Sequence, residues 1–245
     1  MPSDSEPAGS PSSPRRTLAD VLTKLVHGSA PFISTFLLIH LTAPALASLG
    51  GSSLSSQVMI LGREYYQTSF GNTYLLLTPL CVHTLSGLAK RLFAPHTARK
   101  LRSTFALAGY TSMLVLLPIH YALHHDHPAD PAPPVLALAP AELDFEYVKY
   151  ALHTWPWRSA LLYAGLAAAV AWHAVEGEQI LWNTYLRGRF GAWRATVRSR
   201  AFIAAAVVLP VLAGLFALWK EPSYAFMSFI PRYEAAFRQS WVYRL

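Results

Sequence analysis

The sequence predicts an all-α fold, a polytopic bundle of about five transmembrane helices. Of its 245 residues, 53% are hydrophobic and 13% are charged, which is about half of the charged share usual in soluble domains. The hydrophobic residues are gathered in blocks, each close to the roughly 20 residues that cross a bilayer. The five predicted spans are 29–48, 72–92, 103–122, 159–181 and 201–219.

The regions outside the spans divide the chain into three parts. Residues 1–16 are rich in Ser and Pro and contain no apolar run, so we expect a disordered tail. This tail is neither a secretory signal nor a matrix-targeting presequence, because it carries acids and helix-breaking prolines. Residues 17–26 have helical spacing of Leu and Val and are expected to lie at the membrane surface. We therefore predict a tail and amphipathic segment over 1–26, a bundle over 27–220 and a C-terminal tail over 221–245.

The charges of the loops support this topology. Two loops, after the second and fourth spans, contain five basic residues each and no acid: Lys90, Arg91, Arg99, Lys100 and Arg102, then Arg187, Arg189, Arg194, Arg198 and Arg200. The long loop over 123–158 contains the acids Asp126, Asp130, Glu142, Asp144 and Glu146. By the positive-inside rule, the N-terminus and both basic loops lie on the inner side.

Two predicted spans contain the same short pattern, His83-Thr-Leu-Ser-Gly87 and His173-Ala-Val-Glu-Gly177. A histidine is costly inside a bilayer and is a functional candidate there. A glycine four residues later lies on the same helical face and removes side-chain bulk. Two such helices form a slot with an imidazole on each wall, which suits the two axial ligands of a b-type haem. A second interpretation stays open, in which each histidine makes one interhelical hydrogen bond.

The other histidines extend the pattern. His40 and His120, in the first and third spans, form a second candidate pair and complete a weak internal repeat of two spans. The run His124-His125-Asp126-His127 combines imidazoles with a carboxylate, as surface zinc or copper sites do. A solvated loop is the alternative for this run.

Several function classes are excluded. The single cysteine, Cys81, allows no disulfide framework and no cysteine-based metal site within the chain. The net charge of +7 arises from loops and not from a basic stripe interleaved with aromatics, so no nucleic-acid partner is predicted. The sequence contains no nucleophile elbow and no phosphate loop. We predict a protein that is not an enzyme.

The motifs carry a resemblance to known families. The span with His83 and Gly87, followed by Lys90 and Arg91, is similar to the haem-ligating helix of the succinate dehydrogenase and fumarate reductase membrane-anchor superfamily. The run Leu-Gly-Arg-Glu-Tyr-Tyr-Gln at 61–67 before that span resembles the fungal mitochondrial outer-membrane adaptor (MCP-type) family more specifically. The resemblance covers residues 25–220. It implies a multi-pass protein of the mitochondrial outer membrane, with membrane lipids as partners and a role in lipid homeostasis.

The adaptor family also implies recruitment of a VPS-thirteen-class lipid-transfer protein through a Pro-x-Pro motif in the N-terminal tail. This tail has no such motif, and Pro131-Ala-Pro133 lies in the loop on the other side. The alternative function is a haem-containing electron-transfer anchor. The anchors open their first span with His-Arg-x-Ser/Thr-Gly, whereas this chain has His27-Gly28-Ser29-Ala30-Pro31. The missing arginine argues against quinone chemistry. A small transporter or scramblase is a third hypothesis.

Overall fold

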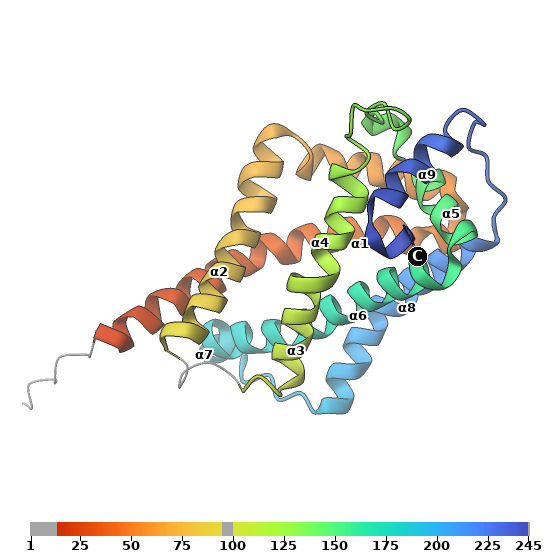
Figure 1. The fold of residues 1–245 in the computed structure, drawn as a ribbon. Helices are drawn as coiled ribbons and strands as arrows, with labels where there is room; N and C mark the ends of the chain where they lie inside the picture. Colours follow the sequence, from red (N-terminus) through yellow and green to blue (C-terminus); the bar gives the residue numbers. More distant parts are fainter. Residues whose placement is uncertain (1–13, 95–99, 245) are drawn as a thin grey trace, which may run out of the picture.

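The computed structural model describes residues 14–94 and 100–244, and every element in these ranges is helical (Figure 1). The predicted disordered tail lies almost entirely outside the described residues, and so does part of the first basic loop. In chain order the elements are α1 (Pro14–Tyr66), η1 (Gly71–Leu77), α2 (Thr78–Phe93), α3 (Thr104–Thr111), η2 (Ser112–Leu116), α4 (Leu117–Tyr121), η3 (Ala122–Asp126), η4 (Pro140–Glu142), α5 (Phe145–Thr154), α6 (Pro156–Leu181), η5 (Trp182–Leu186), α7 (Arg187–Phe190), α8 (Val197–Lys220), α9 (Ile230–Gln239) and α10 (Trp241–Arg244).

Four helical stretches are long and apolar enough to cross a membrane. They are Arg16–Tyr66, Thr104–Asp126, Pro156–Phe190 and Val197–Lys220, and each covers one of the predicted spans to within one residue. The remaining predicted span, 72–92, is helical through η1 and α2 but is not among these four. The all-helical fold is therefore confirmed, with four helices suited to spanning a membrane, while the fifth span and the internal repeat stay predictions.

The first helix is longer than predicted and bends once. Residues 17–26 continue into the first span without a break, so the expected surface segment is the first part of α1. The helical geometry fails at Gly50 and Gly51, where Gly51 has a φ of 60°. Glycine tolerates this left-handed backbone because it has no Cβ. After the bend α1 returns along itself, which brings Tyr66 against Phe36 with 5.1 Å between their ring centres.

Small residues bring the long helices close together. α1 packs against α8 and α2, and α6 packs against α3 and α8. A Cβ at Gly214 would lie 1.7 Å from the carbonyl oxygen of Pro44, so α1 and α8 touch there through their backbones. Such close approach is a usual way for helices to associate in lipid, where burial of apolar surface gives no driving force. Large apolar side chains on the outside, such as Leu38, Leu161 and Phe202, are more than 70% exposed and face the lipid.

The opposite kind of packing closes one end of the bundle. The loop after η3, helix α5 and the segment 221–244 form a cap there (Figure 1). Its core is aromatic: Tyr147, Tyr233, Phe237 and Tyr243 are almost completely buried. The rings of Tyr147 and Phe237 stack with 4.4 Å between their centres. The region predicted as a C-terminal tail therefore forms two short helices that complete this cap.

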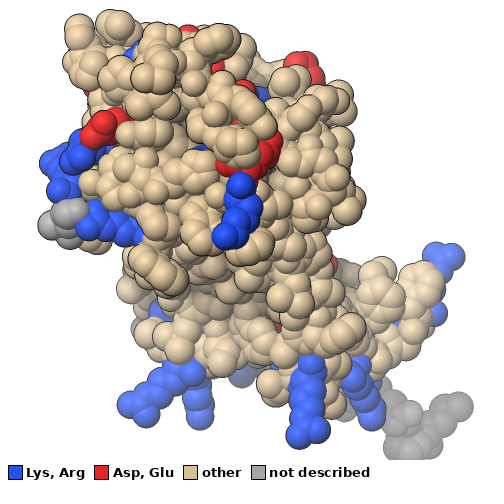
Figure 2. All heavy atoms as spheres, turned by 90° about the vertical axis from the view of Figure 1, so that its right-hand side faces the viewer, with Lys and Arg blue, Asp and Glu red and all other residues tan. Residues whose placement is uncertain are grey.

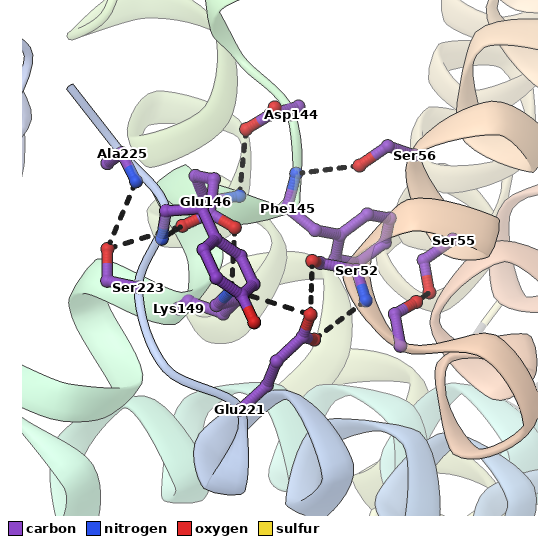
Figure 3. A network of polar contacts seen from close by, with 12 residues as sticks. Ser52, Ser55, Ser56, Asp144, Phe145, Glu146, Lys149, Glu221, Ser223 and Ala225 are labelled. Carbon is purple, nitrogen blue, oxygen red and sulfur yellow. Dashed lines mark hydrogen bonds and ion pairs between the residues drawn. The ribbon is translucent and has the colours of Figure 1, made fainter.

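A buried network of charges fixes the cap to the bend in α1 (Figure 3). The fully buried Lys149 of α5 lies 2.6 Å from a carboxylate oxygen of Glu146 and 3.8 Å from one of Glu221. Glu221 in turn accepts hydrogen bonds from the backbone and the hydroxyl of Ser52, both at 2.8 Å. A Cβ at Gly51 would lie 3.0 Å from the same carboxylate. The end of α8, the bend of α1 and α5 thus share one ion cluster.

The two signs of charge are distributed unequally along the bundle. Figure 2 shows Lys and Arg side chains projecting from the lower end, while the acidic side chains in this view lie in the upper half, together with further Lys and Arg side chains. We call the basic end, where α3 and α8 begin, the inner end, and the capped end the outer end. This distribution is the one that the positive-inside rule favours.

Candidate functional site

The predicted slot brings His83 of α2 and His173 of α6 together. Their ring centres lie 6.1 Å apart and the ring planes are nearly perpendicular, at 84°. Two imidazoles that ligate one iron from opposite sides have ring centres about 6 Å apart, because each bond is about 2 Å and the nitrogen lies about 1 Å from the ring centre. The spacing of this pair therefore suits a shared iron, although direct edge-to-face packing of the rings gives a similar distance.

The backbone fixes the tautomer of both rings. The Nδ1 of His83 lies 3.1 Å from the carbonyl oxygen of Val26, and the Nδ1 of His173 lies 3.1 Å from that of Phe105. A carbonyl can only accept, so each Nδ1 carries the proton and donates it. Each Nε2 is left with its lone pair, and among the described residues neither Nε2 has a hydrogen-bond partner. Metal-ligating histidines have this arrangement, with one nitrogen held by a carbonyl and the other free to bind.

Three residues that the sequence did not single out shape this pair. Ser29 places its hydroxyl oxygen 3.3 Å from the Nδ1 of His83. Phe105 stacks on the ring of His173, with 4.3 Å between the ring centres. A Cβ at Gly109 would lie 2.7 Å from the Nδ1 of His173, so any other residue would displace that ring. The small residue in the third span was the one available signal for Gly109, and the carbonyl acceptors of Val26 and Phe105 leave no trace in a sequence because every residue has a carbonyl.

The two motif glycines have different surroundings. A Cβ added at Gly87 would meet nothing within 4 Å, so the helix face beside His83 is open. A Cβ at Gly177 would lie 3.9 Å from the ring of Phe105, an ordinary contact. Their predicted role in clearing space for a cofactor stays a prediction.

The second predicted pair also meets. The ring centres of His40 and His120 lie 5.9 Å apart at 86°. His40 stands eleven residues beyond Ser29 on α1, which corresponds to about 16 Å along a helix. The two pairs therefore occupy different depths, with His83 and His173 nearer the inner end.

The outer pair is enclosed by aromatic side chains. Phe36 stacks on His40 at 5.1 Å, and Tyr66 approaches it at 6.0 Å. His124 lies beside His120 at 4.6 Å and meets the hydroxyl of Tyr163 at 3.1 Å through its Nε2. The adjoining cavity measures about 10 Å³, which is room for a single water at most.

Residues 61–67 help to enclose the outer histidine pair. Gly62 lets α1 fold back, because a Cβ there would lie 3.0 Å from Ile39 and 3.2 Å from Tyr66. Arg63 reaches into the cap and donates to the carbonyl oxygens of Pro140 and Leu143. Tyr66 completes the wall around His40. The run thus connects the outer histidine pair to the cap.

The histidine run at 124–127 does not converge on one point. His124 faces the bundle interior, whereas His125 is exposed and pairs with Asp126 at 2.8 Å. Burial lowers the pKa of His127, which lies between the two environments. Within residues 14–94 and 100–244, no three His, Cys, Asp or Glu side chains gather around a position that a metal ion could fill. The solvated-loop interpretation fits His125 and Asp126.

Charged groups line the inner end of the slot. Glu176, one turn beyond His173, lies 3.3 Å from a nitrogen of Arg200 and accepts a hydrogen bond from Thr104 at 3.0 Å. The Nε of Arg200 is buried without a hydrogen-bond partner. Arg91, two turns beyond His83, donates to the hydroxyl of Tyr110 at 2.6 Å. Cationic groups therefore stand at the inner end beside both histidine-bearing helices.

The arrangement defines a class of protein, a membrane-spanning helical bundle with two internal histidine pairs. Comparison with protein-family models, with curated proteins and with solved structures gave no match for this chain.

Proposed function

We propose that this chain is a membrane protein that binds haem b between His83 and His173. The observation that carries the proposal is the pair of imidazoles 6.1 Å apart, each with Nδ1 held by a backbone carbonyl. The open face beside Gly87 leaves room for part of a flat cofactor. Cationic side chains at the inner end suit the carboxylates of a haem.

The proposal assigns defined tasks to the residues. His83 and His173 would hold the iron through Nε2, while the carbonyl groups of Val26 and Phe105 orient the rings and raise the basicity of these nitrogens. A haem held by two histidines would supply one-electron transfer.

A spectrum of the purified protein tests this proposal. The full chain, in detergent and supplied with haem, is expected to give a sharp α-band after reduction with dithionite. His83→Ala and His173→Ala are each expected to abolish the band, because a single axial histidine does not give the low-spin spectrum. The exposed His125→Ala serves as the matched control and retains the band.

The outer pair sharpens the test. His40 and His120 have similar spacing but are enclosed by aromatic rings, so His40→Ala is expected to leave the band intact. A band that survives loss of His83 or His173 but disappears with His40 would move the site to the outer pair. A spectrum without any haem band refutes the proposal and leaves the interhelical hydrogen bonds as the role of the inner pair.

We further propose that the protein lies in the mitochondrial outer membrane with five spans and acts there in lipid homeostasis and as an adaptor at organelle contacts. The support is the resemblance carried by residues 61–67 and by the span with His83 and Gly87. The helix over η1 and α2 supports the fifth span, because it packs along α1 and leads back to the inner end where α3 begins. A lipid-transfer protein of the VPS-thirteen class is the proposed partner.

Fractionation and deletion test this second proposal. A tagged chain is expected to accumulate in mitochondria and to lose its N-terminal tag to protease added to intact organelles. Deletion of residues 1–16 is expected to abolish partner recruitment and to leave membrane insertion unchanged. Unchanged recruitment would exclude the tail as the docking element, and a protected tag would invert the topology.

Electron transfer is the second candidate function, favoured by the double histidine ligation that the inner pair permits. In that role the haem is reduced by a physiological donor or a quinol at a useful rate. The first span has no arginine after His27. We therefore expect slow reduction by quinol, measured by stopped-flow absorbance.

A further inference from the structure

A groove runs along the membrane-facing side of η1 and α2. It measures about 400 Å³ and is open along its length, and its apolar wall includes Leu77, Cys81, Val82 and Leu85. Leu25 of α1 lines it as well, close to the inner end of the helix pair. Ligand pockets of proteins measure roughly 300–1,000 Å³. The groove is therefore large enough for part of a lipid. It is also far larger than the cavity of about 10 Å³ at the outer histidines.

The groove lies on a helix face that the bundle leaves uncovered. The main packing partner of α2 is α1, which contributes Leu25 to one edge of the groove. Leu85 is 64% exposed and Leu25 is 44% exposed. In a bilayer this face meets either acyl chains or another protein helix.

The charges at the inner end of the groove indicate which of these occupants it takes. Lys90 stands one turn beyond Ser86, a lining residue, and its ammonium reaches α1 to donate to Thr23 at 2.7 Å. The exposed Lys24 adjoins Leu25 in the sequence. The nearby acid is Asp20, one turn before Lys24. Two ammonium groups thus stand where the apolar groove meets the inner membrane surface.

We propose that this groove binds an anionic glycerophospholipid from the leaflet at the inner end. One acyl chain lies along Leu77, Val82 and Leu85, and the phosphate meets the ammonium groups of Lys24 and Lys90. The attraction of basic residues to anionic headgroups is about 1 kcal/mol for each Lys at a membrane surface. A neutral protein helix would use the apolar face but would bring no anion to the two lysines, which have the carboxylate of Asp20 nearby.

This inference rests on the membrane-spanning part of the proposed function and gives a chemical class to its lipid partner. It does not depend on haem. A haem spectrum recorded on the same samples therefore separates the two proposals, because loss of lipid binding with an intact α-band refutes the groove alone.

Photo-crosslinking tests the groove directly. The full chain is placed in phosphatidylcholine nanodiscs that contain a trace of phosphatidylserine or phosphatidylcholine with a diazirine at mid-chain. After irradiation, the adducts are mapped by mass spectrometry. We expect adducts over 73–86 to be about 30-fold more frequent with phosphatidylserine than with phosphatidylcholine, because each of the two lysines contributes about fivefold.

Two variants and a matched control complete the test. The double variant Lys24→Gln/Lys90→Gln is expected to lower the phosphatidylserine adducts to the phosphatidylcholine level. Leu85→Trp fills the groove and is expected to remove both kinds of adduct over 73–86. Leu209→Trp, on the lipid-facing surface of α8 where Leu209 is 61% exposed, is expected to change neither.

Three results would overturn the proposal. The first is equal labelling by the two lipids in the unchanged chain. The second is a double lysine variant that keeps its preference while its melting temperature matches the unchanged chain. The third is a loss of adducts as the number of chains per disc rises, which would identify a second copy of the chain as the occupant.

Discussion

The inner and outer halves of the bundle hold histidine pairs at almost the same spacing, 6.1 Å and 5.9 Å between ring centres. Their surroundings differ. The inner pair has its Nδ1 atoms fixed by carbonyls and an open face beside Gly87. The outer pair is surrounded by Phe36, Tyr66 and Tyr163, with room for about one water beside it.

This difference separates two uses of histidine in a membrane. The free-energy cost of burying a histidine in a membrane can be offset by a bound cofactor or by neighbouring polar and aromatic side chains. The outer pair follows the second course, since His124 meets a tyrosine hydroxyl and the cap closes above it. The spacing of two imidazoles is therefore insufficient to define a cofactor site. The space beside the rings and the hydrogen bonds to Nδ1 are what distinguish the inner pair from the outer pair.

The largest expected effect concerns the cap that seals the outer half. In Lys149→Met, the carboxylates of Glu146 and Glu221 lose the buried ammonium that lies 2.6 and 3.8 Å away. Breaking a buried pair by removing one partner typically costs about 3–5 kcal/mol. We expect a large fall in the melting temperature of the purified protein, measured by intrinsic fluorescence, with the haem band unchanged below the transition.

Lys220→Met is the control for that prediction, because Lys220 is exposed on the same end of the bundle. It is expected to shift the melting temperature little. Equal shifts in the two variants would show that the buried network does not hold the cap to the bundle. Loss of the haem band in Lys149→Met at low temperature would show that the two halves are coupled.

A smaller effect is expected from the residue that makes room for the inner pair. Gly109→Ala places a Cβ 2.7 Å from the Nδ1 of His173, so the ring must leave its hydrogen bond to Phe105. Loss of such an orienting bond typically lowers affinity for a bound metal about 10- to 100-fold. Titration of the detergent-solubilised chain with haem measures this change.

Gly177→Ala is the matched substitution, because its Cβ would meet only the ring of Phe105 at 3.9 Å. It is expected to bind haem as the unchanged chain does. Similar losses in both variants would mean that the motif glycine, and not Gly109, sets the room around His173. Unchanged haem affinity in Gly109→Ala would show that haem binding does not depend on the orientation of His173.

The sequence predicted the parts of this architecture that depend on one segment at a time. The hydropathy of 29–48, 103–122, 159–181 and 201–219 marked four helices that are long and apolar enough to cross a membrane, because a bilayer imposes a length and a composition on each helix alone. The repeated His-x-x-x-Gly pattern marked two histidines that do meet. Ionisable residues are rare within membrane-spanning segments, so each histidine in a predicted span can be recognised from the sequence by itself.

The parts that depend on distant segments were not predictable. The region over 221–245 contains aromatic residues at no regular spacing, and their partner Tyr147 lies some 85 residues earlier in the chain. The bond that fixes each inner imidazole goes to a backbone carbonyl, which every residue possesses. The bend at Gly50 and Gly51 is visible as a glycine pair, but its contact with Glu221 is visible only in the fold.

The smallest expected effect is a pH dependence confined to the outer cap. Arg232 donates to both carboxylate oxygens of Glu142, at 2.9 and 3.2 Å, and the backbone of Ala139 donates to the same group at 2.6 Å. The hydrogen bonds from Arg232, and then that from Ala139, lower the pKa of Glu142 in the folded chain. The folded state therefore favours the carboxylate. Its stabilisation is complete above the ordinary glutamate pKa of about 4.3, and it is lost as the pH falls through the lower folded-state pKa.

The difference in unfolding free energy between the unchanged chain and Glu142→Gln measures this contribution. Both side chains of the pair are partly exposed, so solvent screening limits the difference to about 1 kcal/mol at pH 7. We expect it to shrink toward zero once the pH falls below the lowered folded-state pKa, where the carboxylate is protonated in both states. The exposed pair of Arg238 and Glu234 provides the control, because Glu234→Gln should have a smaller effect at pH 7. A difference for Glu142→Gln that stays constant from pH 7 to pH 3 would assign its effect to packing. A simultaneous change in the haem band would contradict the separation between the outer cap and the inner histidine pair.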